Sequence, residues 1–158
     1  MFQRPSAADW RLTSLVFIAF AILAVSFGFA SGLFQYELAE PTSILRTAII
    51  ALILPAFLEE LVFRGPVLWL AKRQNRYLPL VAGLSFLLFI LWHPLNGWLF
   101  LTEARDYFFD CRFLIIAAGL GAITTWLACR MRSLWPPIVF HWLAVVGWKA
   151  CLGAPAFL

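Results

Sequence analysis

The sequence predicts an all-α protein, a polytopic bundle of about five transmembrane helices that forms one domain over residues 1–158. The first observation behind this prediction is composition. Hydrophobic residues make up 63% of the chain and charged residues only 13%, whereas soluble domains carry about 25% charged residues. The mean hydropathy is +0.88. So few charges cannot cover a water-exposed surface, which excludes a disordered chain, a cytosolic enzyme and a free nucleic-acid-binding protein.

The second observation is that the apolar residues lie in five long blocks. These blocks cover residues 12–34, 47–71, 77–102, 113–129 and 133–148. About 20 predominantly apolar residues cross a bilayer as a helix, and irregular backbone cannot face lipid, so we expect each block to form a spanning helix. The first block is too long for the apolar core of a signal peptide, which runs about 7–15 residues, and we interpret it as a span.

The third observation is the distribution of charge between the blocks. The basic residues on the side of the N-terminus are Arg4, Arg11, Lys72, Arg73, Arg76, Arg130 and Arg132. The other side holds only Arg46, Arg105, Arg112 and Lys149. Because short cytoplasmic loops are enriched in Lys and Arg, this bias predicts an integral protein of the cell (plasma or inner) membrane with a cytoplasmic N-terminus. Basic loops facing anionic lipid account for the net charge of +4, so the bilayer is the expected partner and no nucleic acid is expected.

Five titratable side chains remain inside the predicted helices: Glu59, Glu60, Arg64, His93 and His141. Placing a charge at membrane depth costs at least about 2.5–3.5 kcal/mol, so such residues are functional candidates. Glu60 and Arg64 are four residues apart, which puts them on one helix face where they can pair. Glu59 is rotated by about 100° from Glu60. It therefore lacks that partner and suits a general base.

The two histidines lie on two other predicted spans. His93 precedes Pro94, which predicts that its helix ends or kinks there, and His141 follows Pro136 and Pro137 near the start of the last span. A single histidine in a membrane helix is often only an interhelical hydrogen bond. Together with two carboxylates, however, two imidazoles supply the groups that activate water and stabilise an oxyanion. A purely structural polar cluster is the competing interpretation.

The depths of these residues along their helices differ. Counted from the flanking basic residues at 1.5 Å per residue, Glu59 lies about 20 Å deep, His93 about 26 Å and His141 about 14 Å. Straight upright helices would hold the three side chains at different levels. We therefore expect tilt, proline breaks or later helix starts to bring them together.

Three motifs in order carry a family resemblance. Residues 59–64 read EELVFR, an EExxxR motif, residues 89–93 read FILWH, an FxxxH motif, and His141 lies in a late span after a proline pair. In this order they resemble the CPBP family of intramembrane proteases, which includes the CAAX prenyl protease 2 type and the lysostaphin-resistance and abortive-infection proteins. The resemblance covers about residues 45–150. It implies an all-helical membrane fold that encloses an endopeptidase site.

The resemblance also implies a role for each candidate residue. Glu59 would be the general base on the attacking water, His93 would hold and polarise that water, and His141 would stabilise the oxyanion. Glu60 with Arg64 would orient Glu59 and balance its charge. The implied substrate is a membrane-associated protein or peptide, and no cofactor is expected. The alternative is zinc held by Glu59, His93 and His141, although the HExxH spacing of many zinc proteases is absent.

The sequence departs from the family pattern at Val145. The family commonly has Asn or Asp four residues after this histidine, and valine cannot donate a hydrogen bond. An oxyanion donor is worth roughly 10²–10³ in rate, and Asn96, Trp142 or Trp148 are candidates to replace it. The departure keeps open a non-catalytic immunity or adaptor protein on the same fold. A proton-coupled carrier is a third hypothesis, but the chain has no internal repeat. The chain is also short for the prenyl protease type, so the CAAX substrate transfers less directly than the chemistry.

Overall fold

The computed structural model describes residues 1–154, so the last four residues of the predicted 1–158 domain lie outside the described part. The described chain is almost entirely helical, which confirms the predicted all-α class. Its elements are α1 (Ala7–Ala30), α2 (Pro41–Ala51), η1 (Leu52–Phe57), α3 (Leu58–Lys72), α4 (Leu78–Leu99), η2 (Thr102–Ala104), α5 (Arg105–Phe108), α6 (Cys111–Met131) and α7 (Trp135–Cys151).

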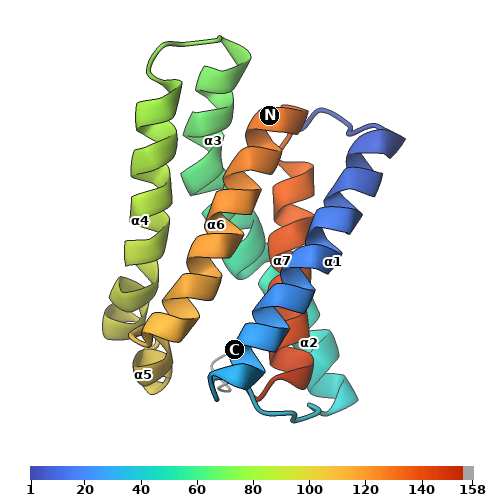
Figure 1. Ribbon diagram of the computed structural model, residues 1–158, viewed down its shortest axis with the longest axis vertical. Coiled ribbons are helices and arrows are strands. Elements are labelled where there is room, and N and C mark those ends of the chain that lie inside the picture. Colours follow the sequence, from blue (N-terminus) through green and yellow to red (C-terminus); the bar gives the residue numbers. More distant parts are fainter. Residues whose placement is uncertain (155–158) are drawn as a thin grey trace.

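Within residues 1–154, four helical stretches are long and apolar enough to cross a membrane: α1, Pro41–Lys72 (α2, η1 and α3 together), α4 and α6. The predicted fifth span, α7, has 17 residues. At 1.5 Å per residue it is about 26 Å long, slightly less than the roughly 30 Å of a hydrocarbon core. Figure 1 shows α7 running between α1 and α6 along most of their length. The chain is therefore an integral membrane protein built as a helical bundle.

The predicted second span is broken in its middle rather than straight. After α2, the π-helical turn η1 contains one non-helical residue, Leu54, with φ −124° and ψ 110°. The next residue is Pro55, which has no N–H to donate and disfavours helical backbone in the residue before it. Regular helix therefore resumes only at Leu58, immediately before Glu59.

Pro94 does not end the helix that carries His93, contrary to one of the two outcomes expected from the sequence. Instead, α4 continues through this proline to Leu99. Proline is tolerated inside membrane helices because neighbouring groups satisfy the carbonyl that it leaves without a donor. The continuation matters because it keeps Asn96, three residues after His93, on a regular helix.

Helix α6 lies at the centre of the bundle and packs against α1, α3, α4 and α7. Its start is set by Asp110, whose side chain accepts a hydrogen bond from the N–H of Arg112. Its end is set by Arg132, which adopts the left-handed conformation with φ 52° and turns the chain into α7. These two local signals bring α6 and α7 together as antiparallel neighbours.

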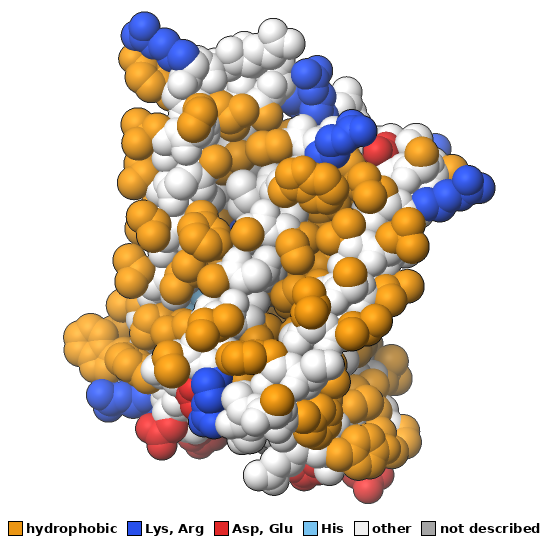
Figure 2. All heavy atoms as spheres, in the orientation of Figure 1, with side chains coloured by type: hydrophobic (Ala, Val, Ile, Leu, Met, Phe, Trp, Pro, Cys, Tyr) orange, Lys and Arg blue, Asp and Glu red, His pale blue; other side chains and the backbone are white. Residues whose placement is uncertain are grey.

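The surface agrees with a membrane protein. Figure 2 shows hydrophobic side chains covering the middle of the visible face, with charged side chains gathered toward the two ends. The N-terminus and the connections at residues 73–77 and 132–134 lie at one end of the bundle in Figure 1. The predicted basic loops are thus at a common end, and the α1–α2 connection lies at the other.

Candidate active site

The break at Pro55 redirects the chain across the bundle. On one side of it α2 and η1 pack against α7, and on the other side α3 packs against α4 and α6. Glu59 and Glu60 occupy the first turn of α3, directly after this change of direction. The two carboxylates consequently enter the interior between α4, α6 and α7 instead of facing lipid.

Glu60 joins α3 to α7. Its Oε1 lies 2.9 Å from Nδ1 of His141, and its Oε2 lies 3.4 Å from Nε of Arg64. The side chains of Glu60 and Arg64 are both 0% exposed, so each charge needs the other as a partner. Because a carboxylate only accepts hydrogen bonds, Nδ1 of His141 is the nitrogen that carries the proton. Glu60 therefore fixes both the orientation and the tautomer of His141.

Arg64 is held by α6 and by an aromatic ring as well as by Glu60. Its Nη2 donates to the carbonyl of Gly121 at 3.1 Å, and its guanidinium lies 4.0 Å from the centre of the Phe89 ring. A Cβ on Gly121 would lie 2.8 Å from Cδ1 of Phe89 and 3.2 Å from Nη2 of Arg64. The close approach of α6 at this point therefore requires glycine.

Glu59 is oriented by α4 and faces α7. Nε1 of Trp92 donates to Oε1 of Glu59 at 3.0 Å. The other oxygen, Oε2, lies 4.0 Å from Nε2 of His141. This oxygen is buried and has no hydrogen-bond partner within residues 1–154. One carboxylate oxygen is thus held in place, and the other is available to accept a proton.

His93 has a defined tautomer as well. Its Nδ1 lies 2.9 Å from the carbonyl oxygen of Phe89. A carbonyl only accepts, so Nδ1 carries the proton, and in the neutral ring Nε2 is left as an acceptor. The centre of the Phe89 ring lies 4.9 Å from that of His93 and 5.9 Å from that of His141. The two imidazoles therefore pack against one aromatic ring.

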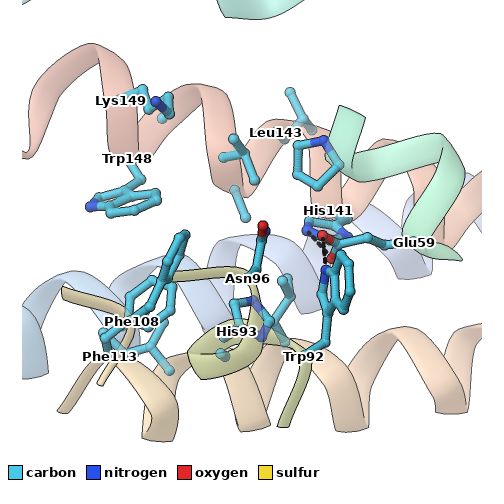
Figure 3. A pocket seen from close by; sticks show the side chains of 18 of the residues that line it. Glu59, Trp92, His93, Asn96, Phe108, Phe113, His141, Leu143, Trp148 and Lys149 are labelled. Atoms are coloured by element: carbon cyan, nitrogen blue, oxygen red, sulfur yellow. Dashed lines mark hydrogen bonds and ion pairs between the residues drawn. The ribbon is translucent and has the colours of Figure 1, made fainter. Parts of the chain in front are cut away.

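A cavity of about 650 Å³ brings these groups together. Glu59, His93, Asn96 and His141 line it, and Figure 3 shows Glu59 next to His141 with Trp92 beside them. Apart from these groups, Lys149 and two indoles, its lining is hydrophobic. A largely apolar cavity with a few convergent polar groups is the usual form of a ligand site.

The structure also explains how Glu59, His93 and His141 meet although they lie at different distances along their helices. The α3–α4 connection stands higher than the α6–α7 connection in Figure 1. Residues far from the α3–α4 connection, in the first turn of α3 and toward the end of α4, therefore meet His141, which lies only two turns into α7. The offset between the two helical hairpins places Glu59, His93 and His141 on one cavity.

Sequence reasoning did not find Trp92, although this residue directly precedes His93 and donates to Glu59. The only signal was its place inside the FxxxH motif. Of the suggested replacements for the missing donor, Trp142 donates instead to the carbonyl of Ala48 at 2.8 Å. Val145 lines the cavity, as expected for a residue one turn after His141.

The alternative of a zinc site finds no ready ligand set in this arrangement. Within the described part of the chain, no three His, Cys, Asp or Glu side chains lie close enough together to hold a metal ion. Glu59, His93 and His141 all line the cavity. Two of the three, Glu59 and His141, have an atom directed at the other across a 4.0 Å gap.

Comparison with known proteins places this arrangement in a family. The family model described as "Type II CAAX prenyl endopeptidase Rce1-like" matches residues 41–147. The match covers α2 through most of α7 and includes Glu59, Glu60, Arg64, His93 and His141. No match is found among curated proteins or among solved structures.

Proposed function

The chain belongs to the Rce1-like type II CAAX prenyl endopeptidase family, and we propose that it is an intramembrane endopeptidase in which Glu59 activates the attacking water. One observation carries the proposal. Oε2 of Glu59 faces Nε2 of His141 across 4.0 Å at the wall of a largely apolar cavity. An acceptor for the proton of water and an imidazole nitrogen thus flank the same point, which is the geometry that hydrolysis of a carbonyl compound needs.

In the first step, a water donates one hydrogen bond to Oε2 of Glu59 and the other to Nε2 of His93. The water oxygen attacks the carbonyl carbon of the scissile peptide bond while Glu59 takes its proton. The carbonyl oxygen becomes an oxyanion. His141 in its protonated form donates a hydrogen bond from Nε2 to this oxyanion, and Glu60 balances the charge of the ring through Nδ1.

In the second step, the tetrahedral intermediate collapses. The bond between carbon and nitrogen breaks, and the departing nitrogen takes the proton that Glu59 had accepted. The products are a carboxylic acid and an amine, and Glu59 returns to its carboxylate form. The reaction consumes one water and no other co-reactant. Each protein residue returns to the protonation state in which it started.

Two residues act through others in this scheme. Trp92 holds one oxygen of Glu59, so that the second oxygen faces His141. Arg64 neutralises Glu60 inside the bundle, so that Glu60 can remain ionised beside His141. Both are positioning residues, because Trp92 lines the cavity but uses its N–H on Glu59, and Arg64 acts through Glu60 and is not part of the lining.

The proposed substrate is a membrane-associated protein or peptide. Most of the cavity lining is hydrophobic, so a segment that enters it exchanges lipid for apolar side chains at little cost. A peptide that carries a prenyl group and a CAAX C-terminus fits this chemistry and the family name, and it is the first substrate to test.

We place the N-terminus on the cytoplasmic side of the cell (plasma or inner) membrane. The supporting observation is the gathering of the N-terminus and the basic connections at residues 73–77 and 132–134 at one end of the bundle. Cysteine accessibility from either side of right-side-out membrane vesicles checks this orientation.

A second function is favoured by one specific feature, Val145. It puts a side chain without a hydrogen-bonding group on the cavity wall, one turn after His141. A protein that had become a non-catalytic immunity or adaptor protein would tolerate such a change. A cleavage assay distinguishes this second function from the endopeptidase.

The test is cleavage of membrane-anchored peptides, including a farnesylated CAAX peptide, by the purified protein in liposomes. The parent should produce a new carboxyl terminus, and Glu59→Gln should not. Glu103→Gln, which removes an exposed carboxyl in the short helix η2, serves as the matched control and should cleave like the parent. Equal cleavage by the parent and Glu59→Gln would contradict the role of Glu59 as the base. No cleavage by either, while both bind a partner protein, would favour the adaptor.

A further inference from the structure

The proposed reaction leaves the oxyanion with one identified donor, His141. The position one turn further along α7, where a second donor on the same helix face would lie, is Val145. Its side chain lines the cavity but has no N–H or O–H group. A single missing donor of this kind costs about 10²–10³ in kcat where it has been measured. A second donor must therefore come from another element if the site is efficient.

The indoles near the site do not fill this role. The N–H of Trp92 is already used by Oε1 of the proposed general base at 3.0 Å. The N–H of Trp142 is used by a backbone carbonyl of α2 at 2.8 Å. Trp148 and Lys149 line the cavity but lie seven and eight residues beyond His141, which is about 10–12 Å along α7.

Asn96 is the remaining neutral donor on the cavity wall. It lies three residues after His93, on the same side of α4, and it is half-buried. Figure 3 shows its side chain pointing from α4 toward α7, in the region between His93 and the pair formed by Glu59 and His141. Within residues 1–154 its side-chain amide makes no hydrogen bond, so both N–H groups are available.

The backbone of Asn96 is anchored at this position. Its carbonyl accepts hydrogen bonds from the N–H groups of Phe100 and Leu101, each at 2.9 Å, at the end of α4. The next residue, Gly97, packs so closely on α5 that a Cβ there would lie 3.0 Å from Cβ of Phe108. This contact fixes the rotation of α4 about its axis. The anchored backbone therefore places the Cα of Asn96 at a defined point on the cavity wall before substrate arrives, and pre-positioned donors stabilise a transition state effectively.

We propose that the side-chain amide of Asn96 donates a hydrogen bond to the oxyanion, and that it replaces, from α4, the donor that Val145 cannot supply from α7. The inference rests on the proposed endopeptidase function. In this proposal two helices supply the oxyanion donors: α7 supplies His141 and α4 supplies Asn96. The hydrolytic step itself is unchanged, because the amide neither gains nor loses a proton.

The test begins with Asn96→Leu, which keeps the size of the side chain and removes its N–H groups. The expected result is a fall in kcat of about 10²–10³-fold, with KM within about threefold of the parent value. Adding Val145→Asn to this variant supplies a donor from α7 and should recover kcat by at least about tenfold. Adding the same change to the parent should raise kcat by a smaller factor than it does in Asn96→Leu, because the donor is already present.

The matched control is the transposition Leu95→Asn with Asn96→Leu. Leu95 is 42% exposed on the outer side of α4, so the transposition keeps the composition and moves the amide out of the cavity. It should remain as slow as Asn96→Leu alone. Recovery by the transposition would mean that the amide acts on stability and not on the oxyanion, and it would overturn the inference.

If Asn96→Leu fails to fold, a second variant and a binding measurement test the inference instead. Asn96→Ala should bind a peptide aldehyde, whose hydrate resembles the tetrahedral intermediate, more weakly than the parent while its affinity for the peptide is unchanged. Parent-like kcat and aldehyde affinity in the Asn96 variants, with Glu59→Gln inactive, would overturn the inference and leave the proposed function standing. An active Glu59→Gln would remove the proposed function and the inference with it.

Discussion

Oε1 of Glu60 lies 2.9 Å from Nδ1 of His141, although 81 residues separate the two in the chain. The other oxygen of the same carboxylate faces Arg64. Glu60 therefore has a partner close to each oxygen, whereas Oε2 of its neighbour Glu59 is paired only with Nε2 of His141 at 4.0 Å within the described part of the chain. Two adjacent carboxylates thus have different surroundings, and the different roles proposed for them follow from that difference.

Glu60→Gln should destabilise the bundle. The change leaves the buried guanidinium of Arg64 without a counter-charge, which typically costs about 3–5 kcal/mol in the free energy of unfolding. Denaturant unfolding in detergent micelles measures the loss. Asp106→Asn, at an exposed position on α5, is the control and should unfold like the parent.

The combination of Glu60→Gln with Arg64→Met tests the pairing itself. If the two charges stabilise each other, the double variant loses less stability than the sum of the two single variants. Strict additivity of the three measurements would contradict the pairing of these side chains.

Trp92→Phe should slow the reaction without weakening substrate binding. The variant keeps an aromatic ring and loses the N–H that donates to Glu59 at 3.0 Å. A hydrogen bond to a charged group contributes about 1.5–3 kcal/mol, so kcat should fall about ten- to hundredfold, with KM nearly unchanged. Trp98→Phe on the same helix, where the side chain is exposed, should have parent-like kinetics. A rise in KM with no change in kcat would show that Trp92 binds substrate and does not position Glu59.

Gly121→Ala should lower stability and disturb the site. The added Cβ would lie 2.8 Å from the Phe89 ring, and overpacking of this kind costs about 1–3 kcal/mol. The control is Gly119→Ala in the same helix, where the nearest atom, Cε2 of Phe20, is 3.5 Å away. This control should be neutral or more stable by up to about 1 kcal/mol, because alanine favours helix. Thermal unfolding of both variants compares them, and equal stability of the two would contradict the close approach of α6 to Phe89.

Chelation should leave the activity intact. The proposed chemistry uses a carboxylate and two imidazoles, and residues 1–154 contain no cluster of three metal-ligating side chains. Incubation with 1,10-phenanthroline, followed by the peptide cleavage assay, should give parent rates. Loss of activity that returns when zinc is added would replace the glutamate mechanism with a metal-dependent one.

The sequence was sufficient to predict the class of the fold, because the apolar blocks and the membrane thickness leave few alternatives to helices. The sequence was not sufficient to predict how the chain runs through the second apolar block, residues 47–71. The position of Pro55 indicated a disturbance, but only packing on α7 determines that the chain changes direction there. Pro94 has the same local signal and leaves α4 continuous. The two prolines differ in their tertiary surroundings, which spacing along the chain does not encode.

The candidate site shows the same division between local and tertiary information. Glu60 and Arg64 are on one helix, so their pairing followed from a spacing of four residues. The pairing of Glu60 with His141 depends on how two hairpins are offset along the bundle, and no local pattern fixes that offset. Trp92 was missed for the same reason, because its partner Glu59 is 33 residues away.

The most direct test of the account is a paired measurement on Glu59→Gln: its affinity for the peptide substrate and its single-turnover cleavage rate in liposomes. Glutamine keeps the shape of the side chain but cannot accept a proton from water. We expect an unchanged affinity and a cleavage rate reduced by about 10²–10⁴-fold, the usual contribution of a general base. A variant that binds and cleaves the peptide at the parent rate would contradict the claim that Glu59 activates the water.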